Sequence, residues 1–135
     1  MPNQFDDHEA LSNSIRKAND TYLALFLKEL KAQSLSNKTI SKHMDNVRFY
    51  LNEFLLYYEP VPMRKGMYEI DEFFGDWFPR KCLWASPTSV KENTASLKKF
   101  YGIMRKLEKI SEEDHQELIR SINENKSLWI ETSTY

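Results

Sequence analysis

The chain has a single cysteine, Cys82, among its 135 residues. One cysteine cannot form an internal disulfide, and such sparing use is typical of a reducing compartment, so the sequence favours a cytoplasmic protein. We expect Cys82 to be a small buried hydrophobic side chain. Glycine and proline are also scarce, at 3 and 5 residues, which indicates few turns between long elements.

Long apolar runs are absent as well. No stretch approaches the roughly 18 residues that a bilayer-spanning helix needs. The first ten residues, MPNQFDDHEA, are acidic and contain no apolar segment, so we expect no secretory signal and no membrane partner. Hydrophobic residues at 41% and aromatic residues at 13% nevertheless suffice for a core and exclude a disordered chain.

Signatures of catalysis or metal binding are also missing. The histidines His8, His43 and His115 fall in separate elements, and with one cysteine there is no zinc-ligand spacing. No glycine-rich phosphate loop or nucleophile motif occurs. Neighbouring carboxylates such as Glu112 and Glu113 are better explained as charges at a helix start. The sequence therefore predicts no catalytic residues, no bound metal and no cofactor.

What the chain does contain is apolar residues at steps of three and four, which predict an all-α fold. Proline residues at 60, 62 and 79 are expected to end helices, and Trp129 is expected to fold back from beyond the last one. No alternation typical of strands is evident. The expected helices cover residues 7–33 as one helix or two divided at Asn19-Asp20, then 37–58, 69–78, 86–108 and 111–125.

Hydroxyl residues mark where three of these helices begin. Ser36 (or Asn37), Ser86 and Ser111 can each accept a hydrogen bond from an orphan N–H of the first turn. Pro87 occupies the first position after its cap, where its missing N–H costs nothing. We expect one helical domain over residues 21–130, preceded by an N-terminal arm or extra helix over residues 1–20.

Two of the helices carry apolar stripes that predict a shared core. The stripe residues recur on one face of each helix. They are Ile40, Met44, Val47, Leu51 and Phe54 in the first, and Val90, Leu97, Tyr101 and Met104 in the second.

The aromatic segment Phe73–Trp84 has two interpretations. Its aromatic residues can close one end of a helical bundle, or they can form an exposed patch for a protein partner.

Charge is distributed unevenly although the net charge is only −1. Residues 80–109 carry a net charge of +6, whereas residues 110–135 carry −4. On the helix over 86–108, Lys91, Lys98 and Arg105 are spaced by seven residues and interleave with Ala95 and Gly102. The positions four residues before and after each of these three cations hold no acidic residue. An external anion is one candidate partner, and Glu113 or Glu117 of the last helix is the other.

Two stretches carry a family resemblance: TISKHMDNVRFYLNEFL and GDWFPRKCLWASPTSVKENTASLKKFYGIMRKLEKIS. They resemble the N-terminal core-binding domain of tyrosine recombinases, the phage-integrase superfamily. The resemblance covers roughly Tyr22 to Glu124. The residues that match the family's pattern are Ser86, Thr88, Ser89, Val90, Leu97, Lys98, Phe100, Tyr101 and Ile110.

This resemblance implies a SAM-like bundle of four to five helices that forms half of a clamp around duplex DNA. The chain departs from the family in lacking the catalytic domain, and Tyr135 has no Arg/Lys/His set around it. The implied function is therefore a non-catalytic DNA-binding module. The alternative is a helical protein-interaction module that keeps the fold and uses the Phe73–Trp84 segment. The residues expected to contact DNA phosphates are Lys38, Lys42, Lys91, Lys98, Lys99 and Arg105.

Overall fold

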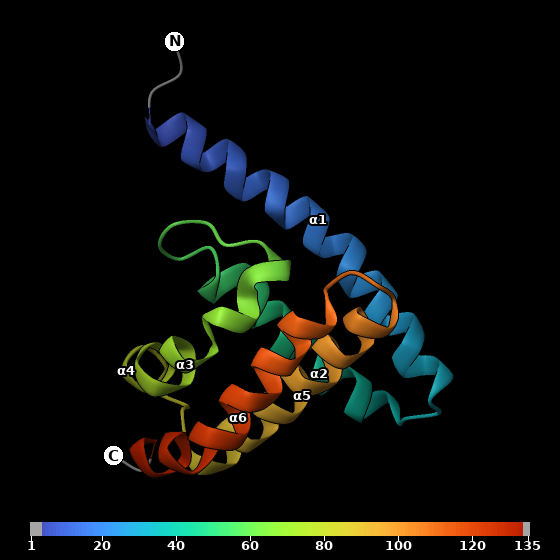
Figure 1. Cartoon of the computed structure of the whole chain (residues 1–135), viewed down its shortest axis with the longest axis vertical. Coiled ribbons are helices and arrows are strands. Elements are labelled where there is room, and N and C mark those ends of the chain that lie inside the picture. The colour runs from blue at the N-terminus through green and yellow to red at the C-terminus, as the bar shows by residue number, and fades with distance from the viewer. Residues whose placement is uncertain (1–3, 134–135) are drawn as a thin grey trace. The chain divides into compact units, whose positions relative to one another are not determined.

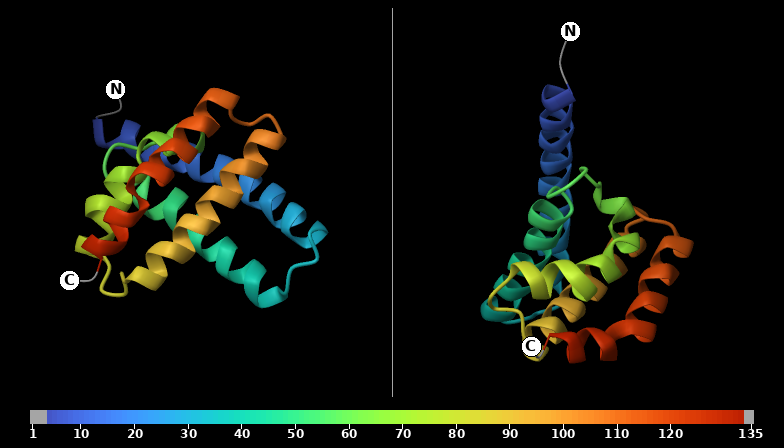
Figure 2. Two further views of the ribbon diagram at one scale, coloured as in Figure 1. Left: turned by 60° about the horizontal axis from the view of Figure 1, so that its bottom comes forward. Right: turned by 90° about the vertical axis from the view of Figure 1, so that its left-hand side faces the viewer.

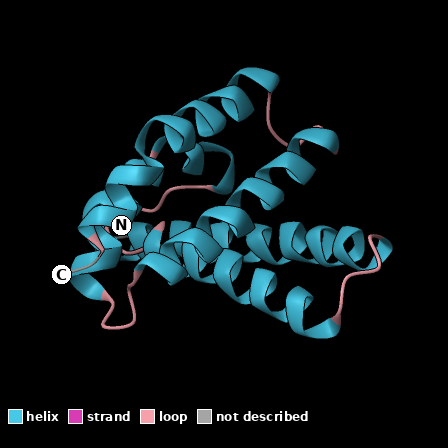
Figure 3. Ribbon diagram, turned by 90° about the horizontal axis from the view of Figure 1, so that it is seen from below, coloured by secondary structure: helices cyan, strands magenta, loops and turns pink. Residues whose placement is uncertain are grey.

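The computed structural model describes residues 4–133, and every regular element in this range is a helix (Figure 3). The all-α prediction is therefore confirmed. Along the chain (Figure 1), the elements are α1 (Gln4–Ala32), α2 (Asn37–Phe49), the π-helix η1 (Tyr50–Phe54), the 3-10 helix η2 (Met63–Tyr68), α3 (Ile70–Glu72), the π-helix η3 (Phe73–Trp77), α4 (Phe78–Lys81), α5 (Pro87–Lys106) and α6 (Glu112–Thr132).

The chain divides into two compact units, Met1–Gly66 and Met67–Tyr135. The single domain expected over residues 21–130 stays a prediction. The arm or extra helix expected over residues 1–20 has no boundary at residue 20, because α1 continues without a break from Gln4 to Ala32. Tyr135 and the first three residues lie outside the described residues.

The first unit is built on α1 and α2, which pack side by side and run in opposite directions (Figure 3). Ser36 caps α2 as expected, with its Oγ accepting a hydrogen bond of 3.1 Å from the Thr39 N–H. Asn19 does not divide α1. Its side chain is buried and donates instead to the backbone oxygen of Leu51 at 3.4 Å and to Asn52 Oδ1 at 2.8 Å.

The second helix of this unit differs from its expected extent of 37–58. α2 ends at Phe49 and the chain continues as η1, where the Leu55 N–H donates to the Tyr50 oxygen five residues earlier. A wider π turn leaves a carbonyl without its usual helical donor, and the Asn19 amide supplies one to Leu51. Tyr50 is buried, and its hydroxyl donates to the Gly66 oxygen at 2.6 Å.

Near the start of the second unit, helical backbone runs from Ile70 to Lys81 and includes most of the aromatic segment Phe73–Trp84. The expectation that Pro79 ends this helix is wrong. An α-helical turn would press the proline ring against the carbonyl of Gly75, four residues earlier. The backbone instead adopts η3 just before this point, with the Phe78 N–H donating to the Phe73 oxygen, and a π turn opens the space the ring needs.

Most aromatic residues of this segment belong to the core. Phe73, Phe74, Trp77 and Phe78 are buried and pack against one another with ring centroids about 5–6 Å apart. An exposed patch formed by these four residues is therefore excluded. Trp84 is half exposed and packs edge-on against Phe78, with the two ring centroids 4.7 Å apart.

The last helix is longer than expected, because α6 extends past Asn125 to Thr132 and includes Trp129. Trp129 is fully buried, with its ring 5.0 Å from that of Phe74. Its Nε1–H donates to Asp71 Oδ1 at 2.8 Å. This tertiary contact stabilises the two extra helical turns, because they place the indole against the aromatic segment.

α5 and α6 form an antiparallel hairpin within the second unit (Figure 2). Ser86 and Ser89 make a reciprocal capping box at the start of α5, and Ser111 caps α6 through the Asp114 N–H. The turn between them is a Schellman motif in which Glu108 has a φ of 60°. The expected starts at Ser86 and Ser111 are confirmed.

All nine stripe residues expected in the core are buried. That the two stripes face one another stays a prediction. The first unit contains Ile40, Met44, Val47, Leu51 and Phe54, and the second contains Val90, Leu97, Tyr101 and Met104.

Replacing Leu97 with alanine is expected to lower the unfolding free energy by roughly 2–5 kcal/mol, because Leu97 has no exposed surface and its truncation leaves a cavity. Urea denaturation followed by circular dichroism measures this change. Lys98→Ala, one position further along the same helix and exposed, is the matched control and should alter stability by less than about 0.5 kcal/mol. Equal effects of the two changes would contradict the assigned orientation of α5.

Candidate nucleic-acid interface

The exposed side of α5 carries three cations in register. Lys91, Lys98 and Arg105 are exposed, and each directly follows a fully buried residue of the apolar stripe. A step of one residue turns a helix by about 100°, so burial of the stripe forces these side chains outward at the edge of the packed face. The structure thus brings Lys91, Lys98 and Arg105 to one side of α5 across its length.

The lysines on this surface have no counter-charge within the described part of the chain. Lys91 and Lys98 are exposed, and Lys99 is half-buried. None of the three forms a hydrogen bond or ion pair with another described residue. Their ammonium groups are therefore available to an external anion.

Arg105 differs, because it forms an ion pair with Glu112 at the start of α6. Glu112 also accepts a hydrogen bond of 2.8 Å from the Gln116 amide. The hydrogen bonds from Gln116 and then from Arg105 lower the pKa of Glu112. About half of each charged side chain is exposed, at 49% and 51%, and such surface pairs contribute little stability. A phosphate can therefore displace Glu112 from the guanidinium at small cost.

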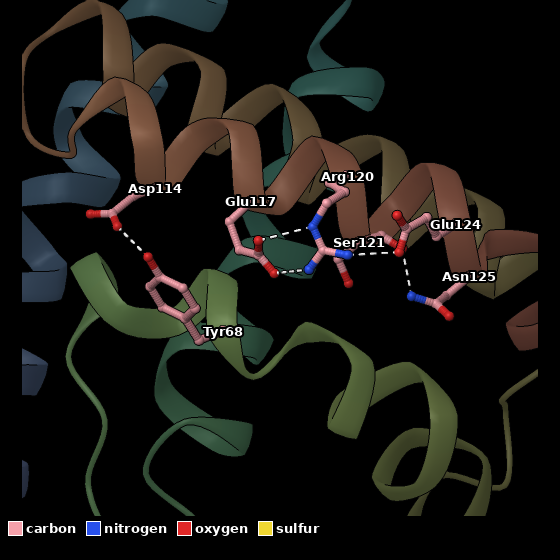
Figure 4. A network of polar contacts seen from close by, with 7 residues as sticks. All are labelled: Tyr68, Asp114, Glu117, Arg120, Ser121, Glu124 and Asn125. Carbon is pink, nitrogen blue, oxygen red and sulfur yellow. Dashed lines mark hydrogen bonds and ion pairs between the residues drawn. The ribbon is translucent and has the colours of Figure 1, made fainter.

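The acidic face of α6 is occupied by partners other than the lysines of α5 (Figure 4). Arg120 lies between Glu117 and Glu124 and bonds to both. Asp114 accepts a 2.6 Å hydrogen bond from the Tyr68 hydroxyl, and this bond raises the pKa of Tyr68. Pairing of the α5 cations with Glu117, expected as an alternative, is therefore wrong.

Glu113, the other acidic residue expected to pair with the α5 cations, is exposed and makes no ion pair with a described residue. The interhelical partner that does exist is Glu112, one residue earlier in the chain than Glu113.

The two small residues of the stripe differ in their surroundings. Ala95 is exposed, so only a small side chain covers the helix backbone between Lys91 and Lys98. Gly102 is half-buried, and a Cβ at this position would lie 3.8 Å from His115 Nε2 on α6. Another molecule can therefore approach the backbone of α5 closely at Ala95, whereas α6 partly covers the backbone at Gly102.

The remaining predicted contacts lie in the first unit. Lys38 and Lys42 are both exposed and one helical turn apart on α2. They belong to the first unit, whereas the cations of α5 belong to the second.

Leu83 is fully exposed in the turn between α4 and α5, although the sequence pattern assigned it no role of its own. The sequence feature that indicates its exposure is an apolar residue within a short connection between helices, next to the half-exposed Trp84.

Groups capable of catalysis are dispersed. Among residues 4–133, no three or more His, Cys, Asp or Glu side chains gather in a way that could hold a metal ion. His8 lies beside the Tyr58 carbonyl at 3.0 Å. Cys82 is buried, and desolvation raises the pKa of its thiol. No helix in the described range is long and apolar enough to cross a membrane.

Comparison with known proteins finds no family model, curated protein or solved structure that matches this chain.

The Arg105–Glu112 pair yields a direct test. Replacing Arg105 with glutamine should raise the pKa of Glu112 towards its ordinary value, because one of the donors that stabilise its charged form is lost. A carboxylate whose pKa is lower in the folded than in the unfolded protein stabilises the fold above its unfolded pKa, and this stabilisation is lost as the pH falls through the folded pKa. The free energy of unfolding of the variant should therefore change less with pH in the acid range. Carboxyl-detected NMR titration measures the pKa directly.

Arg120→Gln is the matched control for this titration, because Arg120 bonds to Glu117 and Glu124 on the same helix. It should raise the pKa of Glu117 and leave that of Glu112 unchanged. An unchanged Glu112 pKa in the Arg105 variant would show that the ion pair does not form in solution.

Proposed function

We propose that this protein is a non-catalytic DNA-binding module that contacts the phosphates of duplex DNA through α5. The observation that carries the proposal is that Lys91 and Lys98 share the exposed side of this helix without an acidic partner among the described residues. In a surface helix that serves only the fold, cations commonly find carboxylates one turn away.

The chemistry of the surface suits phosphate better than base edges. Lysine ammonium groups are point charges on flexible stems, and they neutralise phosphates without a fixed geometry. Lys99 and Arg105 extend the surface on α5, and Lys38 and Lys42 add a second contact on α2. Binding of this kind depends strongly on salt and weakly on sequence.

The finer fold assignment belongs to the same proposal. The capped start at Ser86, the buried Leu97 and Tyr101 and the turn at Ile110 agree with the pattern that resembles the core-binding domain of tyrosine recombinases. On this proposal the chain is a SAM-like bundle. The net charge of −1 limits attraction to DNA at long range, so binding relies on the local field of α5.

The alternative function is a protein-interaction module. It is favoured by Leu83, which is fully exposed, together with the half-exposed Trp84 beside it. Apolar and aromatic side chains that remain outside a well-filled core are typical anchors for a protein partner. The buried Phe78 packs against the exposed turn, with its ring centroid 4.7 Å from that of Trp84.

Fluorescence anisotropy with a 20-base-pair duplex tests the DNA proposal. Affinity should fall with increasing salt along a log–log slope of about −4 to −5 if five or so phosphates are neutralised. Lys91→Ala and Lys98→Ala should each make the slope shallower by about one, because each removes one phosphate contact. The slope and affinity should be similar for duplexes of unrelated sequence.

Lys126→Ala provides the matched control, because Lys126 is an exposed lysine on α6, outside the proposed surface. It should leave the slope unchanged. If the parent fails to bind at low salt while Lys98→Glu remains as soluble and as stable as the parent, the DNA proposal is wrong and the protein-interaction alternative leads. If the α5 and α6 changes alter the slope equally, DNA binding does not depend on the basic surface of α5 in particular.

A further inference from the structure

A pocket of about 220 Å³ lies in the first unit, and none of its lining residues belongs to α5. One wall comes from α1 and the other from the start of η2 and the proline before it. The residues that line it are Ile15, Ala18, Asn19, Tyr22, Pro62, Met63 and Arg64. A dry cavity of 150 Å³ can hold benzene, so this pocket has room for a ring with a short substituent.

Asn19 is a buried acceptor without a donor at the wall of this pocket. Its side chain is 1% exposed. Its Nδ2 donates to two acceptors, the Leu51 carbonyl and Asn52 Oδ1, and these bonds set the orientation of the amide. Its Oδ1 therefore points away from them, and no described residue donates a hydrogen bond to this oxygen. Buried polar atoms without a partner are uncommon and call for a ligand or water.

Arg64 supplies a cation at the same pocket. It is exposed and forms no ion pair or hydrogen bond with another described residue. A guanidinium matches the two oxygens of a carboxylate better than an ammonium does. The rest of the lining is mainly apolar, with Ile15 and Met63 both buried.

We propose that this pocket binds a small carboxylic acid whose ring carries an N–H or O–H donor. The carboxylate pairs with Arg64, the ring lies against Ile15 and Met63, and the donor satisfies Asn19 Oδ1 after a small opening of the wall. The site is independent of the DNA proposal, because none of its residues lies on α5.

Three probes separate the contributions of the two polar groups. Indole-3-acetate has the ring, the N–H and the carboxylate, indole lacks the carboxylate, and 1-naphthaleneacetate lacks the N–H. Isothermal titration of the full chain should show indole-3-acetate binding at least tenfold more tightly than either of the others. Two-dimensional NMR should place the largest shifts on the Asn19 side-chain amide and Arg64 Nε.

Arg64→Gln and Lys65→Gln form a matched pair, because each removes one exposed cation and only Arg64 lines the pocket. The first should weaken indole-3-acetate at least tenfold and the second less than twofold. Equal loss in both variants, or indole binding as tightly as indole-3-acetate, overturns the proposal. No binding of any probe at millimolar concentration shows that the pocket holds only water and also overturns it. Duplex affinity should be the same in both variants and the parent if the two sites are independent.

Discussion

Burial of one apolar stripe on α5 is the constraint on which the second unit and its charged surface depend. Leu97 and its neighbours along the stripe have no exposed surface, so the rotation of α5 about its own axis is set by their packing. Each cation of the basic surface follows a stripe residue by one position. The exposure of Lys91 and Lys98 is therefore a consequence of core packing and needs no further interaction to hold it.

The hairpin partner of α5 keeps that surface basic. A helix as acidic as α6 would be expected to neutralise a neighbouring row of lysines. Among the described residues, Lys91, Lys98 and Lys99 have no such partner, and Arg105 pairs with Glu112. Glu117 and Glu124 are bonded to Arg120 of their own helix, and Asp114 is bonded to Tyr68. Local pairing within α6 thus leaves a basic and an acidic face on one hairpin. The proposed binding of phosphate depends on this division of charge, because the net charge of the chain is near zero.

Two π turns have different consequences in the two units. In η3 the wider turn lets the helix accommodate Pro79, so the aromatic side chains before it stay in the core while Leu83 and Trp84 emerge after it. In η1 the wider turn is accompanied by the hydrogen bond from Asn19 to the Leu51 carbonyl. That bond uses the donor of the amide and leaves its acceptor at the wall of a pocket. The same backbone irregularity therefore accounts for the buried asparagine and for its unsatisfied oxygen.

The sequence alone determined the features that arise from interactions between neighbouring residues. Ser36, Ser86 and Ser111 cap their helices within one turn, and the spacing of apolar residues assigns each side chain of α5 to a buried or exposed side without reference to the rest of the chain. The same spacing of apolar residues, without strand-like alternation, likewise sufficed for the all-α class.

Only the tertiary structure decided outcomes that depend on residues distant in the chain. Asn19 resembles a helix cap in sequence, but its bond to Leu51 makes α1 continuous. The contact of Trp129 with Phe74 and Asp71 prolongs α6, and the geometry of the hairpin selects Glu112 as the partner of Arg105. Local propensities leave such choices nearly balanced in free energy, so a single long-range contact determines which one is adopted.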